Sequence, residues 1–279
     1  MFHGLNLSKG EVIELCHTTA KAAKPIYDDL LTQIRSSPVV YADETGGRED
    51  GKNGYFWSYS TPKIHLLLYR KTRAHTVVEE VFPQEWQQSQ KKVEPILVTD
   101  FYTSYNCYLG LHQRCWVHLL RDINELLEEY PDNLMLKGWS EKVFGVYEQA
   151  THYQGPNPSL PDGLKNQERI NVQHQFEQDL LKACQIYIKT ASPQSTLCGR
   201  VATFLPELFT FIRYPEVKSH NNDAERIIRH LVISRKISGG TRSEKGSETK
   251  SVLTSIFDTW NLQNKNPLAQ CQLLLANYH

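Results

Sequence analysis

Two aspartates in the sequence follow apolar segments that are typical of buried strands. "PVVYADET" places Asp43 directly after residues 39–42, and "PILVTDFY" places Asp100 after residues 96–99. Burying an unpaired carboxylate is costly, so an acidic residue carried by a core strand needs a partner. If the two strands are parallel neighbours, both carboxylates reach the same edge of the sheet. Mg²⁺ or Mn²⁺, which prefer oxygen ligands, would then hold them together.

Each aspartate also has a plainer interpretation. Asp43 could be an ordinary residue at a strand end, and Glu44 competes with it for any role in a site. Adjacent strand residues point to opposite faces, so only one of the two enters the site. The apolar pattern does not choose between them, because both faces of a central strand are apolar. Asp100 could simply cap the helix that follows it.

The elements around these aspartates predict an α/β fold. Three strand-like segments at 39–47, 55–60 and 64–70 form a meander, with Asp50-Gly51 and Asn53-Gly54 as hairpin dipeptides. Two more strands are predicted at 95–100 and 112–117, with helices at 73–82 and 118–130. A meander followed by strand–helix–strand crossovers makes a mixed sheet with helices on its faces.

The remaining segments are predicted to be helical. Residues 8–35 begin with a capping box of Ser8 and Glu11 and are interrupted by Pro25. Amphipathic stretches cover 135–151, 166–190 and 195–212, and "YQGPNPSLPDG" at 153–163 is the clearest loop. "NNDAERIIRHLVISRK" at 221–236 is a helix that "SGG" ends, and two further helices follow.

A third carboxylate, supplied from a helix, would complete a two-metal site. Two ions about 4 Å apart suit in-line attack on phosphorus, because one activates the attacking oxygen and the other stabilises the leaving oxygen. The chemistry indicated by the residues is therefore metal-assisted reaction of a phosphodiester.

Five segments, in this order, resemble the catalytic region of the Asp-Asp-Glu transposases of bacterial insertion sequences, and most closely the insertion sequence 66 family. They are "ADETG", "VTDFYTSY", "QRCWVHLLRD", "NNDAERIIR" and "RKISGGTRSEKGSETKSVLTSIFDT". The resemblance covers essentially the whole chain and implies a ribonuclease H-like fold. It also implies that Asp43, Asp100 and Glu225 form the acidic triad that holds two Mg²⁺ or Mn²⁺ ions.

The spacing of this triad suggests four regions. We expect an N-terminal helical segment at 1–37, the first part of the ribonuclease H-like core at 38–130, a helical insertion at 131–215, and C-terminal helices at 216–279 that complete the core. The insertion accounts for most of the separation of 125 positions between Asp100 and Glu225. By itself, Glu225 could equally be a surface residue paired with Arg229 at i, i+4.

A short motif beyond Asp100 could support the site. Cys115 and His118 match a Cys-x-x-His pair that recurs after the second aspartate in several transposase groups, and we expect them to pack beside the active site. A zinc site that added Cys107 and His112 would have a spacing that no common zinc module shows. Trp116 could stack on an unpaired base or be a core aromatic residue.

The basic residues gather after Glu225. Residues 226–250 hold seven Lys or Arg and two Glu, a net charge of +5, in a chain whose 31 basic and 31 acidic residues balance. We expect this segment to contact DNA phosphates through Arg229, Arg235, Lys236, Arg242 and Lys245. The alternative is a solvated loop between helices.

The expected function is metal-dependent cleavage and strand transfer of DNA at insertion-sequence ends. The expected partners are transposon and target DNA, further copies of the chain and accessory transposition proteins. One alternative is another ribonuclease H-like nuclease, such as a junction resolvase. Another is a truncated, inactive remnant that only binds DNA or a partner, because the chain begins about 40 residues before Asp43.

Composition sets the remaining expectations. Hydrophobic residues make up 40% and charged residues 22% of the 279 residues, which is ordinary for a globular protein. The longest apolar runs are too short to span a bilayer, and the N-terminus lacks the apolar region of a signal peptide. The six cysteines are scattered, which favours reduced core residues and a cytoplasmic location.

Overall fold

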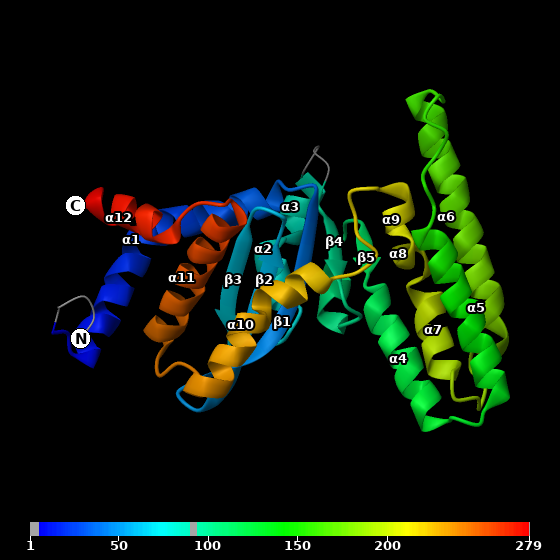
Figure 1. Ribbon diagram of the computed structural model, residues 1–279, viewed down its shortest axis with the longest axis horizontal. Helices are drawn as coiled ribbons and strands as arrows, with labels where there is room; N and C mark the ends of the chain where they lie inside the picture. Colours follow the sequence, from blue (N-terminus) through cyan, green and yellow to red (C-terminus); the bar gives the residue numbers. More distant parts are fainter. Residues whose placement is uncertain (1–5, 90–93, 279) are drawn as a thin grey trace. The chain divides into compact units, whose positions relative to one another are not determined.

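The computed structural model describes residues 6–89 and 94–278, and the chain forms two compact units (Figure 1). Unit 1 comprises Met1–Pro95, Thr103–Leu109 and Asn222–His279, and unit 2 comprises Ile96–Tyr102 and Gly110–Asn221. The strand order is β3-β2-β1-β4-β5 in a five-stranded sheet. The predicted α/β class with a mixed sheet is confirmed, since β1–β2–β3 is an antiparallel meander and β4–β5 is a parallel pair.

Unit 1 contains the meander and most of the N- and C-terminal helices. Its elements are α1 (Lys9–Arg35), β1 (Val39–Glu49), β2 (Lys52–Ser60), β3 (His65–Arg70), α2 (Thr76–Val81), α3 (Gln84–Ser89), the 3-10 helix η1 (Thr103–Cys107), α10 (Asn222–Ser238), α11 (Glu244–Leu262) and α12 (Pro267–Ala276).

The hairpin between β1 and β2 turns at only one of the two predicted dipeptides. Asp50 and Gly51 both have positive φ, 50° and 75°, and connect the paired residues Glu49 and Lys52. This is the two-residue turn that Asp-Gly favours. Gly54 instead lies inside β2, where a Cβ atom would approach the Tyr69 hydroxyl to 2.0 Å. The second glycine therefore serves close packing between strands.

Each face of the meander is covered by a different layer. Strand alternation and the register place Asp43, Ser58 and Leu67 on one face. There Phe56, Leu67 and Tyr69 form a buried cluster with Ile228 and Leu231 of α10. On the opposite face, Trp57 packs edge-on against Tyr105, and Tyr59 against Phe82.

Side-chain hydroxyl groups form hydrogen bonds with the backbone of β3, an edge strand of the sheet. The backbone N–H of His65 donates to Thr259 Oγ1 at 3.0 Å, and that of Leu67 donates to Ser255 Oγ at 2.8 Å. The Tyr27 hydroxyl of α1 donates to the Leu67 carbonyl at 2.8 Å. An exposed strand edge is a template for unwanted pairing, and here α11 and α1 satisfy its polar groups.

The expected interruption at Pro25 does not occur, and α1 runs unbroken from Lys9 to Arg35. An interior proline costs a helix roughly 3 kcal/mol. Buried residues on both sides of it, including Ala23, Leu30 and Ile34, pack the helix onto unit 1. Tertiary packing therefore outweighs the local preference. The predicted capping box of Ser8 and Glu11 is confirmed.

Unit 2 is largely helical around one buried core. Its elements are β4 (Ile96–Thr99), β5 (His112–Arg114), α4 (Trp116–Glu129), α5 (Leu134–Thr151), α6 (Asp162–Cys184), the 3-10 helix η2 (Gln185–Tyr187), α7 (Ser195–Thr203), α8 (Leu205–Leu208) and α9 (Thr210–Arg213). Trp116, Trp139 and Phe209 are among the largest buried side chains of its core. The helices predicted on both sides of the 153–163 loop are confirmed.

Two buried histidines should make the fold sensitive to acid. Burial lowers the pKa of His65, against the opposing effect of Asp258, and lowers the pKa of His112 well below its usual value. The folded chain therefore keeps both rings neutral where the unfolded chain takes up protons, below about pH 6.5. As the pH is lowered below about 6.5, the free energy of unfolding should decrease, by up to about 1.4 kcal/mol per pH unit for each histidine.

Urea unfolding between pH 8 and pH 5 tests this expectation. H65N and H112N should each flatten the pH dependence, whatever their effect at pH 8. H152N, at an exposed histidine that ends α5, is the matched control and should follow the parent chain. An unchanged slope in both H65N and H112N would contradict the assignment.

Candidate active site

Asp43 lies in the middle of β1 and is partly buried. Its Oδ1 accepts the backbone N–H of Glu44 at 2.8 Å, a local contact that orients the carboxylate. Its cross-strand neighbour is Ser58, whose hydroxyl contacts His65 Nε2 at 2.9 Å, and His65 Nδ1 in turn contacts Asp258 at 2.8 Å. Ser58, His65 and Asp258 thus form a chain of polar contacts that begins beside Asp43.

Glu44 points to the other face and is held there by two partners. Its side chain is 1% exposed and forms an ion pair with Arg73, with Arg73 Nε at 2.9 Å from Oε1. The Tyr105 hydroxyl donates to Oε2 at 2.5 Å. Burial and the Glu44 charge raise the pKa of Tyr105 well above its usual value, so this phenol remains a donor. Glu44 is therefore committed to a basic partner on this face.

Asp100 follows β4 in unit 2, and both its side chain and its backbone carbonyl accept hydrogen bonds. Its Oδ1 accepts the Tyr102 N–H at 2.8 Å, as in the capping interpretation. The guanidinium of Arg114, 1% exposed, donates to the Asp100 carbonyl at 3.0 Å and to Glu207 at 2.7 Å. Arg114 also stacks over the Phe204 ring at 4.5 Å. A buried, paired arginine therefore sets where the chain turns at Asp100.

Glu225 stands in the first turn of α10, within unit 1. Ala224, Ile228 and Leu231 form the buried stripe of this helix, and the last two pack on the face of the meander that carries Asp43. Two of the three predicted acidic residues therefore belong to elements packed together in unit 1. An acidic residue in the first turn is also favourable for the helix dipole.

The Cys115–His118 segment forms the start of α4 in unit 2. Cys115 is buried, and its Sγ accepts the Asn221 N–H at 3.2 Å. Trp116 is a core residue: its Nε1 donates to the Leu208 carbonyl at 2.5 Å, and its ring stacks on Tyr147 with centroids 4.7 Å apart. Of the two interpretations of Trp116, the structure therefore matches the core aromatic residue. His118 is partly buried in the first turn.

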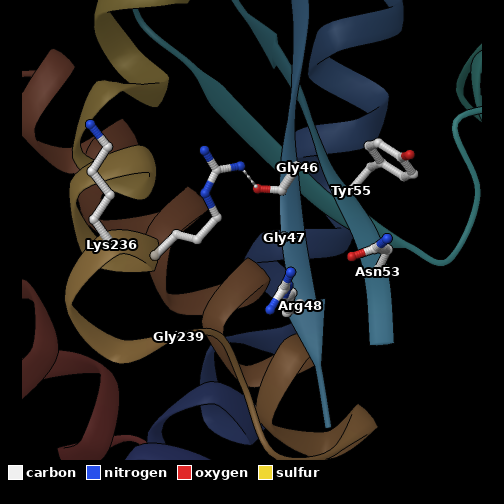
Figure 2. Close-up of a pocket in the computed structure, with 9 residues that line it drawn as sticks. Gly46, Gly47, Arg48, Asn53, Tyr55, Lys236 and Gly239 are labelled. Atoms are coloured by element: carbon white, nitrogen blue, oxygen red, sulfur yellow. Dashed lines mark hydrogen bonds between the residues drawn. The ribbon is translucent and has the colours of Figure 1, made fainter. Parts of the chain in front are cut away.

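The predicted basic residues are divided among three places. Arg235 and Lys236, at the end of α10, line a pocket with Arg48 of β1, drawn in Figure 2. Arg229 is exposed earlier on α10. Arg242 and Lys245 are exposed at the start of α11, and Lys245 approaches Glu14 at 3.6 Å.

Sequence reasoning missed the residues that hold the acidic groups in place. Tyr105 and Arg114 lie within two of the five segments that carry the resemblance, "VTDFYTSY" and "QRCWVHLLRD", but neither segment indicates their partners, and Arg73 lies outside all five. The one available signal was Arg114 itself, an arginine inside a predicted strand. Arg48 was also missed, although it directly follows "ADETGG".

The described residues hold neither a gathered set of metal ligands nor a membrane-spanning helix. Within residues 6–89 and 94–278, no three His, Cys, Asp or Glu side chains lie together as metal ligands would. None of the helices in the same part of the chain is long and apolar enough to cross a membrane.

The sheet and the helices that cover it define an α/β protein with a mixed sheet. The model of the transposase IS66 family matches residues 1–249, and the chain therefore belongs to this family. Two similar proteins come from Sinorhizobium fredii (strain NBRC 101917 / NGR234). The uncharacterized protein y4jD is 24% identical, over 96% of this chain and 55% of its own length. The uncharacterized protein y4jO is 25% identical, over 54% of this chain and 44% of its own length. The chain thus spans about half the length of the curated relatives that it matches.

The two neighbouring carboxylates of β1 should respond differently to neutralisation. Glu44→Gln leaves Arg73 and the Tyr105 hydroxyl without their charged acceptor, and we expect it to lower the free energy of unfolding by about 1–3 kcal/mol. Asp43→Asn keeps an oxygen for the Glu44 N–H, and Asp43 is only partly buried, so we expect a smaller loss than for Glu44→Gln. Urea unfolding at pH 7 measures both, and equal losses would refute the assignment of the two faces.

Proposed function

We propose that this chain is the catalytic region of a metal-dependent DNA transposase with a ribonuclease H-like fold. It would cleave DNA strands at insertion-sequence ends and join them to target DNA. Membership of the IS66 transposase family supports transposition in general. The mixed sheet, with its antiparallel meander, is consistent with the fold that the resemblance implies.

One observation carries the assignment of the catalytic residues. Glu44 is committed to Arg73 and Tyr105 on one face of β1, while α10, with Glu225 in its first turn, packs over the face that carries Asp43. Asp43 is thus the β1 carboxylate on the same face as the helix that carries Glu225. Asp100, at the end of β4, would be the third member.

The three carboxylates have the donor chemistry of the metal that the family implies, although the described residues do not gather them as ligands. Three carboxylates offer hard oxygen ligands, which Mg²⁺ and Mn²⁺ prefer. Two such ions, when bound, would activate the attacking oxygen and stabilise the leaving oxygen. We propose that Asp43, Asp100 and Glu225 hold them, that the Glu44 and Tyr102 N–H groups orient the two aspartate carboxylates, and that Arg114 fixes the backbone at Asp100.

The roles of the protein groups follow from their placement. Basic residues on and after α10 would bind DNA phosphates and position the strand, as the net positive charge of residues 226–250 suggests. In the sequence of steps that the family implies, water is first directed at the phosphodiester at the transposon end. The 3′-hydroxyl that is released then attacks target DNA. Copies of the chain on paired ends and accessory transposition proteins are the partners that we propose.

Strand cleavage by triad variants tests the proposed function. Asp43→Asn, Asp100→Asn and Glu225→Gln should each reduce Mg²⁺-dependent cleavage of end DNA at least a hundredfold, because a lost ligand removes several kcal/mol of transition-state stabilisation. Glu248→Gln, at an exposed glutamate of α11, is the matched control and should cleave normally.

Two other outcomes would change this assignment. Undiminished cleavage in any one triad variant removes that residue from the site. Preference for branched DNA over insertion-sequence ends would favour a junction resolvase, and DNA binding without cleavage by the parent chain would favour an inactive remnant.

A further inference from the structure

A pocket of 440 Å³ lies in unit 1 between the β1–β2 hairpin and the end of α10 (Figure 2). This volume is within the range of sites that bind small ligands. The hairpin supplies Arg48, Asn53 and Tyr55, and α10 and the residue after it supply Arg235, Lys236 and Gly239. The lining is completed by Gly46, Gly47 and Gly54.

The glycine at position 46 lets Arg235 approach the strand closely. The register pairs Gly46 with Tyr55 and Arg48 with Asn53, so all four positions share one face of the hairpin. A Cβ atom at Gly46 would lie 2.8 Å from Arg235 Nη1. Because this Cβ is absent, the guanidinium of Arg235 reaches the strand and donates to the Gly46 carbonyl at 2.5 Å. The positively charged guanidinium therefore occupies the space that a side chain at position 46 would take.

The pocket is suited to an anion. Its lining combines three cations, Arg48, Arg235 and Lys236, with six uncharged residues. Arg235 is held by one hydrogen bond, and a guanidinium has five N–H donors, so it can bind a ligand without losing its anchor. The hairpin carboxylate of Glu49 alternates to the other face from Arg48 and accepts Ser247 Oγ at 2.6 Å.

We propose that this pocket binds a backbone phosphate of DNA at the hairpin end of β1. Gly46 is three residues from Asp43 along the extended strand β1, a distance of about 10 Å. This odd separation places Gly46 and Arg48 on the face of Glu44, opposite to Asp43, so the pocket would contact DNA away from the phosphodiester that reacts. The assignment rests on the proposed function, since it takes DNA as the ligand, and it adds Arg48, Asn53 and Tyr55 to the residues that contact DNA.

The composition of the pocket favours a phosphate within a nucleic acid over a free ion. Asn53 offers an amide and Tyr55 a hydroxyl and an aromatic ring, groups that bind sugars and bases as well as phosphate. The three cations also come from two separate elements, β1 and α10, which suits an extended chain of phosphates. An isolated phosphate would use only part of this lining.

Salt-dependent DNA binding tests the proposal. The full chain is titrated with a fluorescent duplex of arbitrary sequence, because phosphate contacts carry no sequence information. R48Q and K236Q should each weaken binding about tenfold and lower the slope of log Kd against log[salt] by about one. K52Q, which removes an exposed cation of the same hairpin outside the pocket, is the matched control and should change neither quantity. Circular dichroism melts check that the variants fold like the parent chain.

The outcomes separate this proposal from the proposed function. If the parent chain binds and cleaves DNA but R48Q and K236Q keep its salt slope, the pocket assignment is wrong and the transposase assignment stands. If K52Q weakens binding as much as R48Q, the effect is general surface charge, which also overturns the pocket. If inorganic phosphate displaces DNA more strongly than chloride at equal ionic strength, the site is one for a free anion. If the parent chain neither binds nor cleaves DNA, both proposals fail.

Discussion

The ion pair between Glu44 and Arg73 determines how the sheet presents its acidic residues. Two adjacent carboxylates on a central strand must point in opposite directions, and a buried one needs a charged partner. Arg73 and the Tyr105 hydroxyl meet this need on one face. Asp43 is consequently left on the other face, the one that α10 covers. Glu44 is therefore a structural residue, and Asp43 is the candidate ligand.

Close approach through glycine joins segments that are far apart in the sequence. A Cβ at Gly240, whose φ is +120°, would lie 2.4 Å from the Arg48 carbonyl oxygen. Without it, Thr241 N donates to that oxygen at 2.8 Å, and Asp50 N donates to the Thr241 carbonyl at 2.9 Å. Residues 239–241 therefore continue along the edge of β1 beyond Arg235. "ADETGG" and "SGGTR" read as separate motifs in the sequence, yet they form one structure.

Local signals in the sequence predicted most elements but not the contacts that fix the candidate site. Asp50-Gly51 specified its turn, and "SGG" ended α10, because each effect involves only the residues concerned. Asn53-Gly54 carries the same turn signal, but Tyr69 of the next strand uses the glycine for packing. Pro25 likewise lost its usual effect to burial of the residues around it. Arg73 and Arg114 could not be assigned beforehand, because their partners are distant in sequence.

The connectivity of unit 1 explains why its two candidate ligands depend on the end of the chain. β1 is made early, but the helices that cover its face and seal the sheet edge, α10 and α11, come from residues 222–262. Until they pack, the backbone groups of β3 that Thr259 and Ser255 satisfy remain exposed. Contacts separated by so many residues form slowly, because the loop-closure entropy is lost before they form. The same packing brings α10, with Glu225 in its first turn, over the face of β1 that carries Asp43, so the sheet and these two candidate ligands depend on the same contacts.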